Sequence, residues 1–315
     1  MRREILEGGI NQDTQRLSSF AGLQIVSRYN SLMPDLVPLE PVDYLAIGHA
    51  ARDLTPKGAQ LGGTAAYAAL TARALGLRVG IVTAAGTDAS LEPLNGIPLV
   101  SIESDSSTIY ENISTARGRV QYLRARAARI ELDRVPDSWR AASIIHLAPI
   151  ADEVDSVLPK DFSPSLLGLT PQGWMRQWDA EGLVSPRTWK DAERALAQAG
   201  AVVFSREDVN GDDLLIEHLA QQTKILVVTE GAAGAVLYWH GDRRRFRAPS
   251  VREVDATGAG DIFAAAFFIR YLNTRDPWEA TRFATLLASH SVERAGLDGV
   301  PTQLEIEQSR MVVIP

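Results

Sequence analysis

Short apolar runs alternate with helix-compatible segments along the chain after residue 41. Near-continuous apolar strands that alternate with helices are typical of a parallel sheet covered on both faces. The strands predicted on this basis lie at residues 42–48, 79–84, 143–147, 166–169, 201–204 and 225–229. The predicted helices lie at 65–75, 188–198, 212–220, 259–273 and 277–294. The pattern therefore predicts one α/β domain over residues 41–315.

Two stretches depart from this pattern. Between residues 97 and 130, polar and apolar residues alternate, as expected for a half-exposed antiparallel sheet. Residues 235–239 and 244–248 read as a hairpin that turns at Gly241-Asp242. Residues 1–40 are mixed and polar, and we interpret them as an extension outside the domain.

Composition limits the classes of partner. The 315 residues are 45% hydrophobic and 23% charged, which suits a large folded core. The net charge of −7 argues against nucleic acid or an anionic membrane as the main partner. No apolar run approaches the ~20 residues of a membrane span, and the first residues lack the apolar core of a signal peptide. A cytoplasmic location is the resulting expectation. Without cysteine, disulfides and thiolate chemistry are excluded.

The strongest chemical signal is the stretch from Val254 to Phe263, which reads VDATGAGDIF. Its glycines let the backbone turn sharply ahead of a long apolar helix, whose first N–H groups then face a ligand. The positive end of the helix dipole favours an anion there. Asp261, in the first turn, would repel a bound phosphate unless it takes a proton from an attacking hydroxyl. The stretch therefore predicts phosphoryl transfer, with Asp261 as the base.

The same stretch resembles the signature of the ribokinase-like (PfkB) carbohydrate kinases, and the resemblance extends over residues 42–302. It implies a mostly parallel central sheet with helices on both faces and a small β lid, here near 51–64 and 97–130. It also implies ATP and Mg²⁺ as cofactors. In the family the last aspartate is the catalytic base, which falls on Asp261. The anion hole falls on the amides of Gly258, Ala259 and Gly260.

Other positions match family sites in the same way. Asp53 follows the first strand, where a family aspartate binds substrate hydroxyls, and Gly62 and Gly63 match a glycine pair that touches substrate. The segment from Thr229 to Gly234 resembles the turn that borders the nucleotide, which assigns Thr229, Gly231 and Gly234 to that site.

Several positions depart from the family pattern. Where the family has Asn-x-x-Glu, this chain has Ser205 near the nucleotide and Asp208 for the metal-orienting glutamate, with Glu207 as an alternative. Tyr67 stands where many members have a sugar-binding asparagine, so it either meets an atypical substrate or belongs to the core. The segment from Gly168 to Arg176 is similar to one in the myo-inositol kinase branch, so Gln172 and Arg176 would approach ligand.

Two other sets of residues bear on ion binding. Asp255 and Thr257 would offer oxygen ligands to a monovalent cation such as K⁺, as in several family members. The five histidines show no metal-ligand spacing, so we interpret them as structural.

Two functions are compatible with these patterns. The first is an ATP-dependent kinase for a hydroxyl of a small sugar, polyol or nucleoside. The second is a non-catalytic relative that senses a sugar or nucleotide, which the Ser205 and Asp208 replacements would allow. The intact signature favours the kinase, because a pure binder needs no base. Both a monomer and a homodimer are compatible with the sequence.

Overall fold

The computed structural model describes residues 39–55, 58–115 and 118–311. The predicted N-terminal extension lies outside this range except for its last two residues. Across the described part of the chain, no helix is both long enough and apolar enough to cross a membrane.

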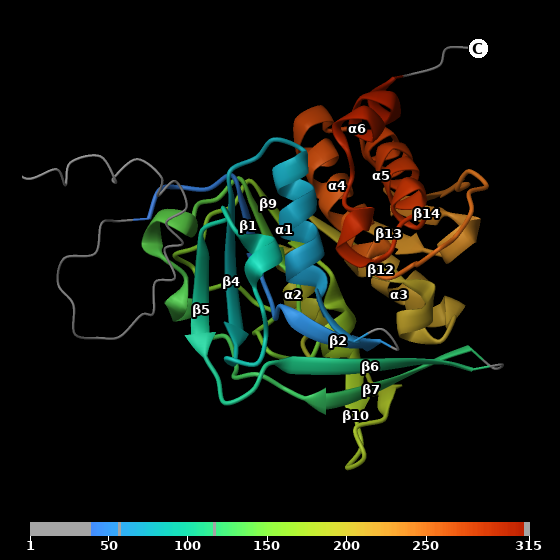
Figure 1. The fold of residues 1–315 in the computed structure, drawn as a ribbon. Coiled ribbons are helices and arrows are strands. Elements are labelled where there is room, and N and C mark those ends of the chain that lie inside the picture. Colours follow the sequence, from blue (N-terminus) through green and yellow to red (C-terminus); the bar gives the residue numbers. More distant parts are fainter. Residues whose placement is uncertain (1–38, 56–57, 116–117, 312–315) are drawn as a thin grey trace, which may run out of the picture.

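A mixed sheet of nine strands forms the centre of the molecule (Figure 1). Its strands in spatial order are β15 (Asp242–Phe246), β14 (Ala235–Trp239), β13 (Ile225–Thr229), β12 (Ala201–Ser205), β9 (Leu166–Leu169), β8 (Ile144–Leu147), β1 (Tyr44–Ile47), β4 (Val79–Ala85) and β5 (Leu99–Glu103). All neighbours from β13 to β5 pair in parallel, and only the β13–β14–β15 end is antiparallel. The predicted parallel sheet is confirmed.

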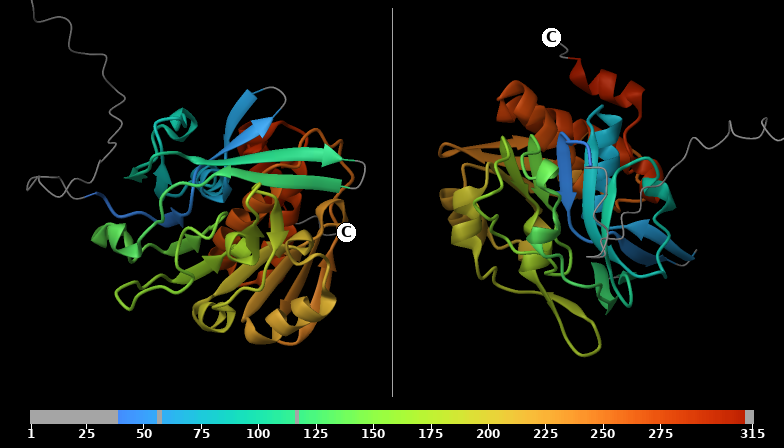
Figure 2. Two further views of the ribbon diagram at one scale, coloured as in Figure 1. Left: turned by 90° about the horizontal axis from the view of Figure 1, so that it is seen from below. Right: turned by 90° about the vertical axis from the view of Figure 1, so that its left-hand side faces the viewer.

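Helices cover both faces of this sheet, because its central strands are apolar on both sides. In β1, Tyr44 and Ala46 belong to a buried cluster on one face of the sheet, called the first face and first cluster below. Leu45 and Ile47 belong to the cluster on the second face. The helices of the first face are α1 (Thr64–Ala74), α4 (Ala259–Thr274), α5 (Pro277–Ser291) and α6 (Gln303–Arg310). The helices of the second face are α2 (Ala192–Gln198) and α3 (Asp213–Gln222) (Figure 2).

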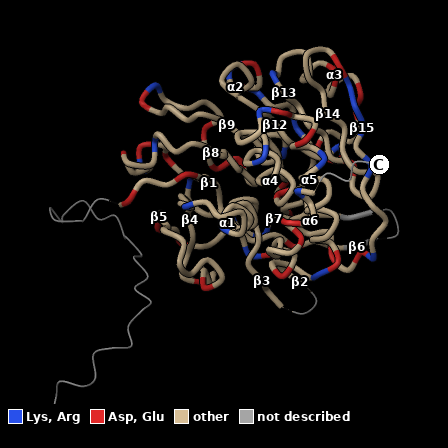
Figure 3. The backbone as a smooth tube through the Cα atoms, turned by 90° about the horizontal axis from the view of Figure 1, so that it is seen from above, with Lys and Arg blue, Asp and Glu red and all other residues tan. Residues whose placement is uncertain are grey.

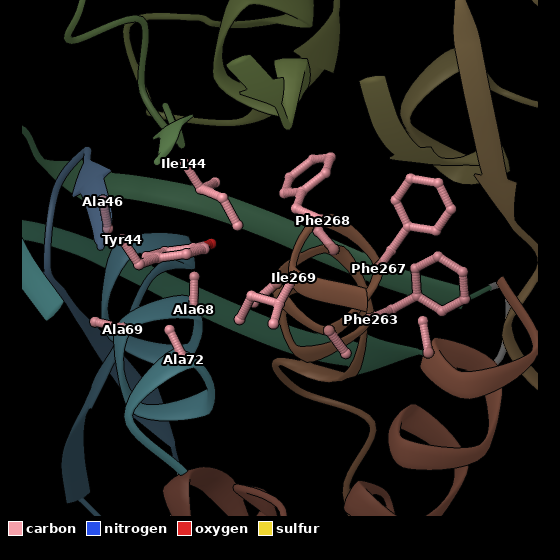
Figure 4. Close-up of a cluster of buried hydrophobic side chains, with 14 of the residues drawn as sticks. Tyr44, Ala46, Ala68, Ala69, Ala72, Ile144, Phe263, Phe267, Phe268 and Ile269 are labelled. Atoms are coloured by element: carbon pink, nitrogen blue, oxygen red, sulfur yellow. The ribbon is translucent and has the colours of Figure 1, made fainter. Parts of the chain in front are cut away.

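Helix α4 is fixed against the middle of the sheet by aromatic side chains. Phe263, Phe267 and Phe268 project from α4 into the first cluster (Figure 4). A Cβ at Gly168 of β9 would lie 2.7 Å from the Phe268 ring, so only glycine lets this ring pack on the strand. The packing sets the position of the N-terminus of α4.

A second, four-stranded sheet forms the predicted lid, in the order β3 (Gly58–Gly62), β2 (Ala51–Thr55), β6 (Thr108–Thr115) and β7 (Gly118–Ala125). Its long strands β6 and β7 lie across the carboxyl ends of the central strands (Figures 1 and 2). The predicted lid boundary needs one correction. Residues 99–103 form β5 and pair with β4 in the large sheet, so the second lid segment begins at Thr108.

An additional hairpin, not predicted from the sequence, joins the lid to the large domain. Its strands are β10 (Arg176–Trp178) and β11 (Val184–Pro186). Near its tip, Leu183 bridges to Tyr122 of β7, and the Gly182 carbonyl accepts a hydrogen bond from the Leu123 amide at 2.8 Å. The hairpin thus lies along the outer edge of the lid sheet.

The hairpin of β14 and β15 is confirmed with a shifted turn. Positive φ angles fall on His240 and Gly241, so these two residues form the turn rather than Gly241 and Asp242. Strand β15 carries three exposed arginines along the edge of the large sheet (Figure 3). Charged side chains on an edge strand oppose pairing with another chain.

Candidate active site

A cavity of about 510 Å³ lies between the lid, the carboxyl ends of the central strands and the N-terminus of α4. Parallel α/β sheets bind ligands at this edge. The cavity brings together most of the predicted site residues. Those that line it are Asp53, Gly63, Tyr67, Gln172, Ser205, Thr229, Gly231, Gly234, Thr257, Gly258, Ala259, Gly260 and Asp261. The predicted residues Gly62, Asp208 and Asp255 lie outside its lining.

The first turn of α4 presents open backbone to this cavity. Gly258 is the N-cap residue, with φ +80°, and the helix begins at Ala259. The first N–H groups of a helix have no carbonyl partner within it. A Cβ on Gly260 would meet nothing within 4 Å, so a ligand can approach the chain closely there. The local geometry is that of an anion-binding helix terminus.

Two constraints require glycine at position 258. Its positive φ is strained for any side chain, and an added Cβ would lie 2.3 Å from the Tyr67 ring. Tyr67 is only 1% exposed and reaches this position from α1. The Tyr67 ring therefore packs against the backbone of Gly258, and it also lines the cavity.

We expect Gly258→Ala to destabilise the fold and to lower activity. The left-handed φ alone costs roughly 1–2 kcal/mol with a side chain, and displacing Tyr67 adds to that cost. Gly241→Ala is a matched control, because φ is +78° there and nothing lies within 4 Å of the new Cβ. Thermal melting should show the larger loss for Gly258→Ala, and equal losses would contradict a role for the Tyr67 contact.

Asp261 lies in the first turn of α4 and faces the cavity. Burial raises the pKa of Asp261 from 3.8 to about 6, while a hydrogen bond from the Thr64 side chain acts in the opposite direction. The negative charge of Asp53 adds to the rise, and Arg176 opposes it. A carboxylate with a pKa near 6 is ionised at pH 7 yet still basic enough to accept a proton.

Asp53 comes from lid strand β2, and the residue is 8% exposed. A Cβ at Gly62, on the adjacent strand β3, would lie 2.0 Å from Asp53 Oδ2. Gly62 therefore makes room for this carboxylate. At Gly63, φ is +88° and a Cβ would lie 2.5 Å from the His49 carbonyl oxygen. The Asp53 side chain thus accounts for Gly62, and close backbone packing with a positive φ accounts for Gly63.

The predicted nucleotide turn follows β13. The Glu230 amide donates to the Gly234 carbonyl at 2.7 Å, which closes the turn. At Gly234, φ is +96° and a Cβ would lie 1.9 Å from the Phe246 carbonyl oxygen, so this turn packs directly on β15. The apolar cavity residues at this end were not predicted; they are Ala232, Ala248, Pro249, Val251, Ala288 and Val292.

The segment after β12 forms a capping box. The Asp208 side chain accepts from the Ser205 amide at 2.9 Å, and Ser205 Oγ accepts from the Glu207 amide at 3.2 Å. Asp208 Oδ1 also accepts from Gln172 Nε2 at 3.1 Å and from Arg176 Nη2 at 3.4 Å. Both oxygens of Asp208 are therefore engaged. Glu207 is the carboxylate of this segment that lines the cavity.

Asp255 stabilises the approach to the signature. Its Oδ1 accepts from the Thr257 amide and its Oδ2 from the Gly296 amide, both at 2.9 Å. No cluster of three or more histidine, cysteine, aspartate or glutamate side chains suited to a metal occurs in residues 39–55, 58–115 and 118–311. A cation here would have to take most of its ligands from a bound substrate, water or backbone carbonyls.

Comparison with known proteins agrees with this geometry. Residues 190–303 match the model of the pfkB family carbohydrate kinases. A cytidine kinase of Thermococcus kodakarensis is 26% identical over 285 residues, which cover 81% of this chain and 98% of the relative. Solved structures of other kinases share the fold, and two of them serve as examples. A pyrophosphate-dependent kinase in the ribokinase family, complexed with a pyrophosphate analog and myo-inositol, has TM-score 0.70 and 21% identity, with 84% of this chain and 99% of that chain covered. The ribokinase of Arabidopsis thaliana complexed with ribose and ATP has TM-score 0.62 and 17% identity, with 86% and 100% covered.

The family model spans the signature of α4, the turn after β13 and the capping box after β12. The structural likeness adds the lid and the remaining strands. The predicted fold and the predicted class of enzyme are thereby confirmed. Residues 190–303 thus match the pfkB family of carbohydrate kinases, and the chain has a ribokinase-like fold.

Proposed function

We propose that the protein transfers the terminal phosphoryl group of ATP to a hydroxyl of a small, uncharged polyhydroxy acceptor. The observation that carries the proposal is that Asp261, the first turn of α4, Asp53 and the Thr229 turn share one cavity. A base, an anion site, a hydroxyl-binding carboxylate and a nucleotide turn are what such a transfer needs.

At the acceptor end, Asp53 accepts hydrogen bonds from substrate hydroxyls, and Gln172 reaches the same space. Among the described residues that line the cavity, Asp53, Glu207, Glu253 and Asp261 give a negative charge against a single arginine. A neutral sugar, cyclic polyol or nucleoside is therefore favoured over an acidic acceptor. The relatives include a cytidine kinase and a kinase complexed with myo-inositol, and both names support a neutral polyhydroxy acceptor.

Part of the cavity lining is apolar, including Ala232 in the Thr229 turn. The small apolar side chains beside the Thr229 turn offer a surface to a flat heterocyclic base, which pyrophosphate lacks. Thr285, Ser289 and Ser205 add polar groups to the lining. The lining thus supports a nucleoside triphosphate as donor, as in the ATP complex of the Arabidopsis ribokinase.

In the proposed reaction, Asp261 takes the proton of the attacking hydroxyl as its oxygen bonds to the γ-phosphorus. The amides at the start of α4, from Gly258 to Gly260, stabilise the charge on the moving phosphoryl group. Thr64 orients Asp261 through its hydrogen bond. The lid strands exclude water, which would otherwise compete as an acceptor.

The donor set fits Mg²⁺ bound mainly through ATP. Mg²⁺ usually keeps several waters and takes one or two carboxylates plus substrate phosphates. Glu207 is the carboxylate of this segment that lines the cavity and could bind the ion. When bound, the ion would neutralise charge on the donor phosphates. Both Asp255 oxygens accept hydrogen bonds from backbone N–H groups. A K⁺ site at Asp255 and Thr257 therefore stays a prediction, and the proposed reaction does not require it.

A panel of acceptors tests the proposal. ATP or pyrophosphate is incubated with sugars, inositols and nucleosides, and ADP or phosphate release and the phosphorylated product are measured. We expect turnover with ATP and at least one neutral acceptor. Calorimetric binding of an acceptor without any phosphoryl transfer would instead support the sensor, and turnover with pyrophosphate alone would contradict the nucleotide donor.

The pH dependence follows from the raised pKa of Asp261. The base must be ionised, so kcat/KM is expected to fall about tenfold per pH unit below a pKa of about 6. Above that pH the profile should be flat until another group titrates. A limb near pH 4 would show that the carboxyl group is not desolvated in solution.

A further inference from the structure

The cavity has a marked imbalance of fixed charge. Its lining contains Asp53, Glu207, Glu253 and Asp261, whereas Arg176 is the only lysine or arginine among the described residues that line it. A transferring phosphoryl group brings further negative charge into this space. Apart from Mg²⁺ and the first turn of α4, Arg176 is the one source of positive charge on these walls.

Arg176 is firmly held in this position. It is the first residue of β10, and its side chain is 18% exposed. One guanidinium nitrogen contacts Asp208 Oδ1 at 3.4 Å, and Gln172 Nε2 donates to the same oxygen at 3.1 Å. The guanidinium also hydrogen-bonds with Tyr110 of the lid, whose hydroxyl donates to the Ile150 carbonyl.

The hairpin that carries Arg176 is anchored at both ends. Trp178 and Val184 pack against the lid cluster that includes Tyr110 and Leu123. At its base, the Arg187 amide donates to the Met175 carbonyl at 2.8 Å. The guanidinium therefore has a fixed origin and a preset direction, as an electrostatic catalyst requires.

The neighbours of Arg176 locate it between the two substrates. Tyr110 belongs to the acceptor side, with Asp53 on the adjacent strand. Asp208 and Ser205 belong to the donor side. Across the cavity, the charge of Arg176 acts on Asp261. The space between these groups is where the phosphoryl group must pass.

We propose that Arg176 is a catalytic residue that binds the transferring phosphoryl group, and that Asp208 and Gln172 are positioning residues that aim its guanidinium. The inference rests on the proposed kinase function. As the acceptor oxygen bonds to phosphorus, the bond from phosphorus to the β,γ-bridging oxygen breaks. The hydroxyl proton passes to Asp261, and the bond pair leaves with ADP. Arg176 donates hydrogen bonds to the oxygens of the group in transit.

Asp208 has a different part in this arrangement from the metal role predicted for it. All of its recorded contacts are to hydrogen-bond donors: the Ser205 amide, Gln172 and Arg176. Arg176 contacts Asp208 through one nitrogen only, with Nη2 at 3.4 Å from Oδ1. Most of the N–H donors of the guanidinium are therefore available to a ligand. The metal-directed carboxylate is then Glu207.

The first test replaces Arg176 in the full chain. For Arg176→Gln we expect kcat to fall about 10²- to 10³-fold, with the KM values for ATP and acceptor changed less than threefold. Arg176→Lys should recover only part of the loss, because an ammonium lacks the planar fork. Added guanidinium ion should restore activity to Arg176→Ala but not to Arg176→Gln. Arg124→Gln is the control, since Arg124 pairs with Glu111 on the lid and does not line the cavity.

The second test separates positioning from metal binding. Asp208→Asn should lower kcat without changing the Mg²⁺ concentration for half-maximal rate, and Glu207→Gln should raise that concentration. The double variant Arg176→Gln/Asp208→Asn should be no slower than Arg176→Gln alone. Asp208 acts only by positioning the Arg176 guanidinium, so its loss has no further effect once that guanidinium is gone. A shifted Mg²⁺ requirement in Asp208→Asn, with multiplicative losses in the double variant, would overturn the assignment of Asp208.

A third measurement does not depend on finding the acceptor. ADP with aluminium fluoride imitates the planar phosphoryl group in transit. Arg176→Gln should weaken binding of this mimic at least tenfold while ADP alone binds as in the wild type. Wild-type kcat or undiminished mimic binding in Arg176→Gln would overturn the inference alone, whereas failure of the wild type to phosphorylate any acceptor would count against the proposed function.

Discussion

Asp261→Asn is expected to lower kcat by a factor of about 10² to 10⁴, the usual worth of a positioned general base. Asparagine keeps the size of the side chain and its hydrogen bond with Thr64, but it cannot take a proton at neutral pH. The helix terminus and the Thr229 turn are unchanged, so ATP binding should stay within a fewfold of the wild type. Steady-state kinetics and calorimetry measure the two effects separately.

The stability of this variant supplies the control for folding. Because burial raises the pKa of Asp261 above that of the unfolded chain, ionising it opposes folding as the pH rises from about 4 to 6. Asparagine removes this cost, so Asp261→Asn should melt at or above the wild-type temperature at pH 8, by the equivalent of roughly 1–3 kcal/mol. The gain should shrink towards pH 4. Retained turnover in a stable variant would refute the assignment of the base.

The fold was predictable where the sequence pattern is strong. The central strands are apolar on both sides, and α4 follows a signature in which Gly258 permits the positive φ of the N-cap. The pattern misled at β5, because Leu99 to Glu103 alternates at the edge of the large sheet just as a lid strand does. Strands β10 and β11 have three residues each, too few to show any period.

The candidate site was predictable in part for similar reasons. Local motifs located the groups that a single turn brings together, such as Gly258 and Asp261. Contacts between distant segments were hidden. Asp208 meets Gln172 and Arg176 from more than thirty residues away, and this network appears only once β9 and β12 are adjacent. The hydrogen bond of Thr64 to Asp261 likewise depends on how α1 packs on α4.

A buried carboxylate next to the cavity should be the most sensitive position for stability. Glu153 is fully buried and accepts hydrogen bonds from the backbone amides of His49, Ile150 and Ala151 at 2.7–3.0 Å. His49 lies in the short connection between β1 and lid strand β2, and Ile150 follows β8. Glu153 therefore connects the start of the lid to the loop at the carboxyl end of β8 in the large sheet.

Glu153→Ala would leave three buried N–H groups without their acceptor. Each unsatisfied group costs about 1–3 kcal/mol, so we expect a loss of several kcal/mol. For a chain of this size that corresponds to a fall in melting temperature of roughly 5–10 °C. Glu217→Ala, at an exposed position of α3, is the control and should change the melting temperature by less than about 2 °C.

The same variant tests whether the lid junction also serves the acceptor. Ile150 lines the cavity, and its carbonyl accepts from Tyr110, so a loosened junction should displace the lid strand that carries Asp53. Below its melting temperature, Glu153→Ala should then show a raised KM for the acceptor and a nearly normal KM for ATP. Equal changes in both KM values would indicate general softening of the fold. A melting temperature within 2 °C of the wild type would mean that water replaces the carboxylate, and that the lid is held chiefly by its apolar contacts.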